Sequence, residues 1–225
     1  MCGSPVSLPP NKRAWTLRRL APALVLAALT GACSSAPTPA TFDLSAPSSR
    51  IRGAAGVQVL VAEPAALQSL STQQILVKDA SGAISSLGGG QWADNLPRLI
   101  QTRLINTFEN ASQLRGVARP SSGAVADAQL ISELRRFEIS TPGNEAVVEI
   151  SAKVVSDRAG RVVTGRVFRA SVPVAQVNAA AVAPALDQAL SIVLVDMARW
   201  IGGASARVAA SDAATNPPVS TAAVQ

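Results

Sequence analysis

The sequence predicts an α+β fold: a single domain in which a mainly antiparallel sheet is packed by two amphipathic helices. Two stretches place apolar residues at three- and four-residue steps, which is typical of helices that bury one face. Three consecutive stretches alternate apolar and polar residues and are joined by turn sequences, which is typical of neighbouring strands. Apolar residues make up 48% of the 225 residues, enough for a core, while aromatic residues make up only 3%, so aliphatic side chains must do most of the packing.

Short strands are predicted before the first helix. Residues 41–44 suggest a short edge strand, and residues 56–61 alternate before a Glu-Pro step ends the pattern. Residues 65–70 are interpreted as a loop or one helical turn. Residues 74–78 and 83–87 flank Ala-Ser-Gly and predict a hairpin. Three glycines follow at positions 88–90; since no Lys-Ser/Thr comes after them, they fit no nucleotide-binding fingerprint and predict a flexible turn.

The first helix is predicted over residues 91–110. Asp94 or Asn95 is expected to cap its start, and Trp92 to pack just before its first turn. One face carries the apolar residues Leu96, Leu99, Ile100, Leu104 and Phe108. Arg98 and Arg103 lie beside this stripe and are interpreted as a solvated flank.

After a short strand near residues 116–118, three long strands are predicted over residues 128–139, 145–156 and 161–174. In the first, the apolar residues change parity, which predicts a bulge near Arg135 and Arg136. The second has the cleanest half-buried alternation, and its inward set is Ala146, Val148, Ile150, Ala152 and Val154. The arginines of the third, Arg161, Arg166 and Arg169, are interpreted as an exposed face or edge, with contact to anionic lipid as the alternative.

The second helix is predicted over residues 178–201, with regular geometry starting near Ala183 because Pro184 interrupts its first turns. Its apolar stripe comprises Leu186, Leu190, Val193, Met197 and Trp200. Gly202 and Gly203 are expected to end it. Residues 204–225 are rich in Ala, Ser, Thr and Pro without periodicity and predict a disordered tail, which leaves residues 51–203 as the domain.

The N-terminal 32 residues have the organisation of an export signal. A basic patch of Lys12, Arg13, Arg18 and Arg19 precedes an apolar run from residue 20 to residue 29, about half the length needed to cross a bilayer. Four of the 20 basic residues lie in this segment, so 16 remain against 14 acids, a formal charge of +2. This small, scattered charge predicts no nucleic-acid surface.

The signal ends in Leu-Thr-Gly-Ala-Cys, which resembles the maturation site of bacterial lipoproteins, although Thr30 stands where leucine is usual. The resemblance implies cleavage between Ala32 and Cys33 and acylation of Cys33, for example with palmitate; the alternative is a free thiol. Two or more acyl chains anchor a protein stably, whereas one holds it only marginally. Residues 33–50 are rich in Ser, Pro, Ala and Thr and are interpreted as a tether. In enterobacterial lipoproteins, an Asp directly after the acylated cysteine favours retention in the inner membrane. Ser34 stands there in this chain, so the resemblance implies the outer membrane, with inner-membrane anchoring as the alternative.

Few residues of the kind used in catalysis are present. The chain contains no histidine and, beyond Cys33, only Cys2 in the export signal. The usual zinc ligands, Ser-His and Cys-His pairs and an intramolecular disulfide in the mature chain are therefore excluded. The carboxylates Glu133, Glu138, Glu145 and Glu149 alternate with core residues on strands and are interpreted as a solvated face. The sequence argues against an enzyme and calls for no cofactor or metal.

The order of these elements resembles the ABC-type transport auxiliary lipoproteins, the group that includes paraquat-inducible lipoprotein C, from about residue 42 to residue 201. The residues that carry the resemblance are 41–44, 75–78, Trp92 with 96–104, Phe137 and 189–200. Phe137 stands where a Tyr-Tyr pair is frequent, and Gln91 where a basic residue is usual.

The resemblance implies a periplasm-facing accessory subunit of a transport system. Its partners would be a protein with a mammalian-cell-entry (MCE) domain and the ABC transporter subunits, one of which supplies the ATPase. The system would move phospholipid or another hydrophobic substrate between the inner and outer membranes, with lipid as a candidate cargo of this chain. Two alternatives remain: an outer-membrane assembly lipoprotein similar to those of lipopolysaccharide assembly, and a structural envelope lipoprotein.

Overall fold

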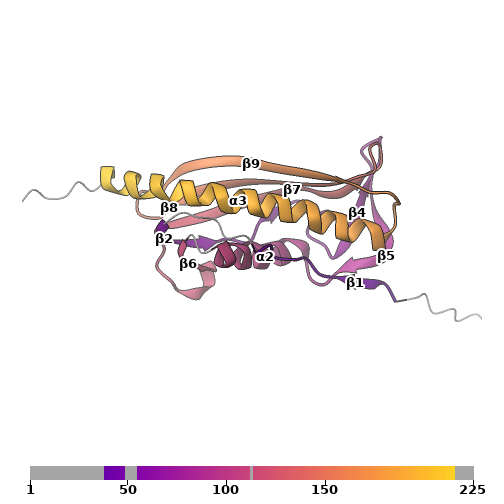
Figure 1. The fold of residues 1–225 in the computed structure, drawn as a ribbon, viewed down its shortest axis with the longest axis horizontal. Helices are drawn as coiled ribbons and strands as arrows, with labels where there is room; N and C mark the ends of the chain where they lie inside the picture. The colour runs from indigo at the N-terminus through magenta and orange to yellow at the C-terminus, as the bar shows by residue number, and fades with distance from the viewer. Residues whose placement is uncertain (1–37, 49–54, 112–113, 216–225) are drawn as a thin grey trace, which may run out of the picture. The chain divides into compact units, whose positions relative to one another are not determined.

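The computed structural model describes residues 38–48, 55–111 and 114–215. These residues form a mixed nine-stranded sheet packed by two α-helices, so the predicted α+β class is confirmed (Figure 1). The strands are β1 Ala40–Phe42, β2 Ala55–Val61, β3 Ala65–Ala66, β4 Gln74–Lys78, β5 Ile84–Trp92, β6 Leu114–Ala118, β7 Ala128–Ser140, β8 Glu145–Ser156 and β9 Arg161–Pro173. The helices are α2 Leu96–Ala111, a short 3₁₀ turn at Pro120–Ser122 and α3 Ala179–Thr215.

Strand β7 organises the sheet because both of its edges are used. One edge pairs antiparallel with β8, which in turn pairs antiparallel with β9. The other edge accepts three short strands in succession, all parallel: β2, then β3, then β4. The long ladders are therefore antiparallel, as predicted. The short strands beside β7 are parallel to it because the chain advances along β7 in one direction, from Val59 opposite Ala128 to Lys78 opposite Ser140.

The predicted bulge in β7 is confirmed. The register with β8 shifts between Leu134 and Arg136, so Leu130 and Leu134 face the core before the shift, and Phe137 and Ile139 after it. A single inserted residue thus keeps both halves of the long strand buried on the helix side of the sheet.

The glycines at positions 88–90 lie inside β5, not in the flexible turn that the sequence predicts. The β4–β5 register shifts there, from Leu76 opposite Ser86 to Gln74 opposite Gln91, so the glycines form a bulge. A Cβ added at Gly90 would lie 2.7 Å from the Cβ of Ala179 and from the ring of Phe42. Position 90 therefore lacks a side chain because β1 and the start of α3 approach the backbone closely.

Helix α2 begins at Leu96 and not at residue 91, because residues up to Trp92 belong to β5. The backbone carbonyl of Asn95 accepts the first helical hydrogen bond, from the N–H of Leu99, at 3.0 Å. The five residues of the predicted apolar stripe are all buried, as is Trp92. The period of the sequence therefore identified the correct face of the helix, although not its first residue.

Helix α3 is longer at both ends than the sequence predicts. It begins at Ala179, where the Asn178 side-chain oxygen accepts a hydrogen bond from the N–H of Ala181 at 3.0 Å, and Pro184 is exposed within it. It continues through Gly202 and Gly203 to Thr215, so the predicted end at residue 201 is wrong, as is a tail that starts at 204. Ala204 and Val208 are each only 1% exposed, and their burial extends the helix beyond the glycines. Residues 216–225 lie outside the described residues.

Helix α3 packs along β8 and β9 and also contacts α2 (Figure 1). Within the described residues, its segment Ala179–Ala204 is the one helix long and apolar enough to cross a bilayer, and half of that segment is buried in the fold. Its stripe residues Leu186, Leu190, Val193 and Met197 are at most 1% exposed. We therefore interpret α3 as the core helix of the domain.

Candidate functional site

The described residues contain no cluster of three or more His, Cys, Asp or Glu side chains that could hold a metal ion. The four strand carboxylates are dispersed, and three of them have arginine partners. Glu133 pairs with Arg135 at 3.3 Å, and Glu149 with Arg169 at 3.9 Å. Glu138 departs from the prediction of a solvated face: its side chain is 6% exposed and accepts hydrogen bonds from Arg136 Nε at 2.6 Å and the N–H of Phe137 at 3.1 Å.

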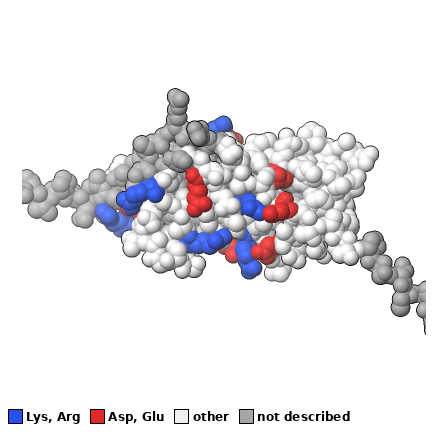
Figure 2. Space-filling model, turned by 60° about the horizontal axis from the view of Figure 1, so that its bottom comes forward, with Lys and Arg blue, Asp and Glu red and all other residues white. Residues whose placement is uncertain are grey.

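Charged side chains are scattered on the face drawn in Figure 2, basic groups beside acidic ones, and part of that surface carries none. On β9, Arg166 is exposed and lies 5.1 Å from the centroid of the Phe168 ring, and Arg169 is also exposed. The predicted exposure of these two arginines is confirmed. That face presents no broad surface of one sign that would attract a nucleic acid.

The predicted lipidation site, Cys33, and the cleavage position at Ala32 lie outside the described residues. Six residues separate Cys33 from Ala40, where β1 begins. Strand β1 pairs in parallel with β5, from Ala40 opposite Gly90 to Phe42 opposite Trp92.

Two polar contacts fix the segment that follows β1. Arg103 Nη2 on α2 donates to both carboxylate oxygens of Asp43, at 2.5 Å each. The N–H and hydroxyl of Ser45 donate to the Asp187 carboxylate on α3, at 2.6 and 2.5 Å. Arg103 is only 18% exposed, so its interpretation as a solvated flank is wrong, whereas Arg98 is 62% exposed as predicted. The contacting residues are 60 and 142 positions apart in the chain. The spacing of apolar residues within one helix or strand cannot predict contacts between such distant residues.

The Asp43–Arg103 pair predicts a small loss of stability in acid. Partial burial pushes the pKa of Asp43 up, but the hydrogen bonds from Arg103 and from the N–H of Leu44, together with the charge of Arg103, outweigh it and leave the pKa below its usual range. The pair therefore stabilises the fold above the ordinary pKa of aspartate, and this contribution is lost as the pH falls through the lowered value. Because Asp43 is 60% exposed, we expect Asp43→Asn to cost about 0.2–1 kcal/mol at pH 7.

Urea unfolding of the unaltered protein and of the Asp43→Asn variant, at pH 7 and at pH 3, measures this effect. The difference in unfolding free energy between the two should be smaller at pH 3. An Asp43→Asn cost that stays constant over this range would contradict the assignment. Arg98→Gln is a suitable control, since Arg98 is exposed and pairs with Asp94 only at 3.6 Å.

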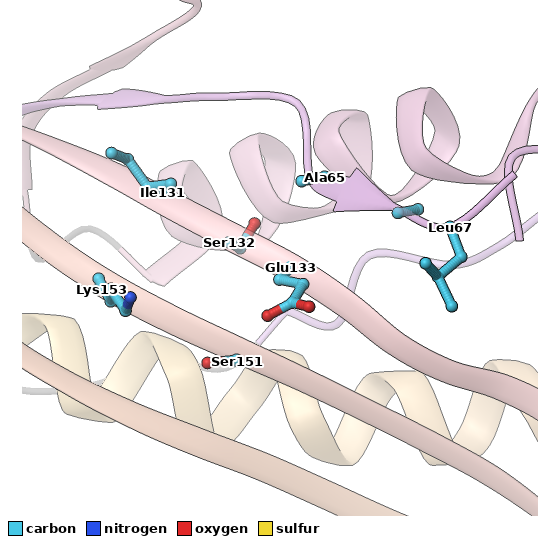
Figure 3. A pocket seen from close by; sticks show the side chains of 8 residues that line it. Ala65, Leu67, Ile131, Ser132, Glu133, Ser151 and Lys153 are labelled. Carbon is cyan, nitrogen blue, oxygen red and sulfur yellow. The ribbon is translucent and has the colours of Figure 1, made fainter.

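A hollow of about 370 Å³ lies on the sheet over β7, between the end of β3 and β8 (Figure 3). Its walls come from Ala65, Ala66, Leu67, Ile131, Ser132, Glu133, Ser151 and Lys153. Leu67 is 72% exposed and Ile131 is 43% exposed, so two large apolar side chains face solvent at the same hollow. Of these residues, only Glu133 was named from the sequence, as part of a solvated face. Ile131, an apolar residue at an outward position of its strand, was a further signal.

The family comparison covers most of this domain. A family model described as the ABC-type transport auxiliary lipoprotein component matches residues 41–198, from β1 to the middle of α3. An uncharacterised protein of Bradyrhizobium diazoefficiens is 35% identical over 166 residues. The match covers 71% of this chain and 44% of that protein, so the chain spans less than half the length of this relative.

Solved structures share the fold. A crystal structure of a Xanthomonas campestris protein matches with a TM-score of 0.69 and 25% identity, over 76% of this chain and 99% of that one. A second crystal structure, of an uncharacterised protein, matches with a TM-score of 0.59 and 14% identity, over 73% of this chain and 99% of that one. The second likeness bears on the fold alone.

Proposed function

Because the chain belongs to the ABC-type transport auxiliary lipoprotein family, and thus to a transport system of the cell envelope, we propose a specific role for it. The chain is anchored by acylated Cys33, faces the periplasm from the outer membrane and serves an MCE-type transporter. That transporter moves phospholipid or another hydrophobic substrate between the two membranes. The ATP-hydrolysing subunit is a separate chain.

One observation carries this proposal: the family match begins at residue 41, only eight residues after Cys33. Export signal, thiol, tether and family domain therefore follow one another without an intervening domain. A short tether of this kind keeps its domain close to the membrane that holds the acyl chains. The contacts of Asp43 and Ser45 with α2 and α3 favour the same role, since they join the start of the domain firmly to its helices.

The mechanism that follows is docking. The acyl chains hold Cys33 in one leaflet, the tether sets the reach of the domain, and the sheet and helices offer a preformed surface to the MCE protein. Binding of a preformed surface avoids the entropic cost of ordering it. In this role the chain holds a binding surface for the MCE protein at the membrane, and a transporter subunit hydrolyses ATP.

Isolation of the tagged, full-length protein from detergent-solubilised membranes tests the proposal. We expect the MCE protein and the ABC transporter subunits to be enriched at least about tenfold over an unrelated outer-membrane lipoprotein, the difference that 1.4 kcal/mol of binding free energy gives. Equal recovery with both baits would count against the transporter role. Enrichment of β-barrel or lipopolysaccharide-assembly proteins would support the assembly alternative in its place.

A further inference from the structure

The hollow over β7 lies on a row of residues in register across four strands, in which Ala65 and Ser151 are small and Glu133 lies between them. Ala65 on β3 pairs with Glu133 on β7, Glu133 with Ser151 on β8, and Ser151 with Val167 on β9. Adjacent strands lie about 4.8 Å apart, so this row crosses about 14 Å of sheet. Between the larger side chains, the methyl group of Ala65 and the hydroxymethyl group of Ser151 leave a trough.

Two large apolar side chains that line the trough, Leu67 and Ile131, are exposed; its polar residues are Ser132, Glu133, Ser151 and Lys153. Leu67 and Ile131 lie at opposite ends of the trough (Figure 3). Val167, which is 47% exposed and pairs with Ser151, adds a further apolar side chain on β9. Exposed aliphatic side chains that converge on one hollow mark a binding surface, whereas isolated ones need no explanation. An apolar ligand, and not water alone, therefore suits this trough.

The size of the hollow favours a small ligand. Its volume of about 370 Å³ lies in the range of about 300–1,000 Å³ typical of small-molecule pockets. A helix with its side chains is about 10–12 Å in diameter, too thick to enter a trough bounded by neighbouring rows of one sheet. A single hydrocarbon chain laid across the strands fits these dimensions.

One cation is available beside the trough. Within the described residues, no carboxylate lies within 4.0 Å of the Lys153 ammonium group, whereas Arg135, Arg136 and Arg169 each pair with a glutamate. Across the ladder from Lys153 stands Gly165, and a Cβ there would lie 3.4 Å from the lysine Cγ. The missing side chain leaves room for the stem of the lysine beside the trough.

We propose that this trough binds the acyl chain of a lipid and that Lys153 binds the adjoining anionic group, a phosphate or a carboxylate. The apolar walls remove the chain from water, and the unpaired ammonium selects the charged end. This inference deepens the proposed function, because it relies on the chain residing among envelope lipids. It assigns a lipid-binding role to the domain itself, in addition to docking.

Photo-cross-linking of the full-length protein in cells tests the inference. Cells are grown with a fatty acid that carries a diazirine and an alkyne, so that their lipids become cross-linkable, and are then illuminated. After denaturing purification and digestion, we expect lipid adducts on peptides that contain Leu67, Ile131 or Ser151. The mass of each adduct distinguishes a phospholipid from a free fatty acid.

Two variants sharpen the test. Ser151→Trp fills the trough, and we expect about tenfold fewer adducts; Ser191→Trp, the same change on the outer face of α3, should leave the yield unchanged. Lys153→Gln leaves the trough open and should lower the yield of anionic-lipid adducts by about two- to fivefold, the scale of an exposed ion pair. Because Lys153 is exposed, this second variant keeps the fold.

The same digest separates this inference from the proposed function. Labelled Cys33 without adducts at the trough would overturn the inference and leave the anchor in place. Adducts at the trough with an unlabelled Cys33 would support the inference and reject the anchor. Equal adduct yields from Ser151→Trp and Ser191→Trp would overturn it, as would a cross-link found only to the acyl group of Cys33 itself.

Discussion

Replacing Cys33 by alanine is expected to abolish the mature, acylated form of the protein and its presence in the outer-membrane fraction. The thiol is the atom to which the first acyl group attaches, and the resemblance to lipoprotein signals implies that cleavage follows this step. The expected product is an acyl-free chain that retains residues 1–32. Stable anchoring needs at least two acyl chains, at about 0.8 kcal/mol per buried CH₂, and residues 34–225 contain no cysteine that could carry them in place of Cys33.

Intact-mass analysis of the protein from separated inner and outer membranes measures the result. The matched control is Cys2→Ala, since Cys2 lies in the segment that is removed. That variant should give the same acylated product as the unaltered chain. An outer-membrane location that survives Cys33→Ala would refute the proposed anchor.

Replacing Trp92 by alanine is expected to be the most damaging change in the core. Trp92 is 1% exposed and meets Phe137 edge-to-face, with ring centroids 5.5 Å apart and an interplanar angle of 81°. It lies at the end of β5 just before α2, so its ring joins the sheet to the helix layer. Removal of such a buried aromatic side chain costs about 3–5 kcal/mol.

For a domain of this size, that loss corresponds to a fall in Tm of about 6–20 °C. Thermal and urea unfolding followed by circular dichroism measure it. Trp200→Ala is the control: Trp200 also meets a phenylalanine edge-to-face, Phe168 at 5.4 Å, but it is only partly buried. We expect Trp200→Ala to cost less than half as much. Equal costs for the two tryptophans would place the centre of the core elsewhere.

Much of the secondary structure could be predicted because each long element buries one face. The structure gives β8 as Glu145–Ser156, the predicted range, and its five predicted inward residues are all buried. In β7, the apolar residues move from even to odd positions, and this change predicted the bulge. In α2, apolar residues recur every three or four positions, and this spacing predicted its buried face. In each case the signal is local, because the period of the backbone decides which side chains share a face.

Elements governed by distant contacts were not predicted correctly. The glycines at positions 88–90 lie in β5, and position 90 needs a glycine because Phe42 and Ala179, both far away in the chain, approach its backbone. Arg103 is held by Asp43, which is 60 positions away. Glu138 is buried where β4 and β8 flank it, opposite Leu76 and Val147. Helix α3 passes two glycines because the residues beyond them are buried. A sequence pattern describes none of these neighbours.

The sequence by itself predicts the export signal and the acylated thiol at its end, and it determined the alternating and helical periods of the domain, since each depends on residues close together in the chain. Only the tertiary structure decided which strands share β7, what holds the segment after β1 and where the surface is hollow. Leu67, Ile131 and Lys153 come from three separate segments, and only the pairing of β3, β7 and β8 places them around one trough. Strand register across long loops is set by the sum of many weak contacts, and no local pattern encodes that sum.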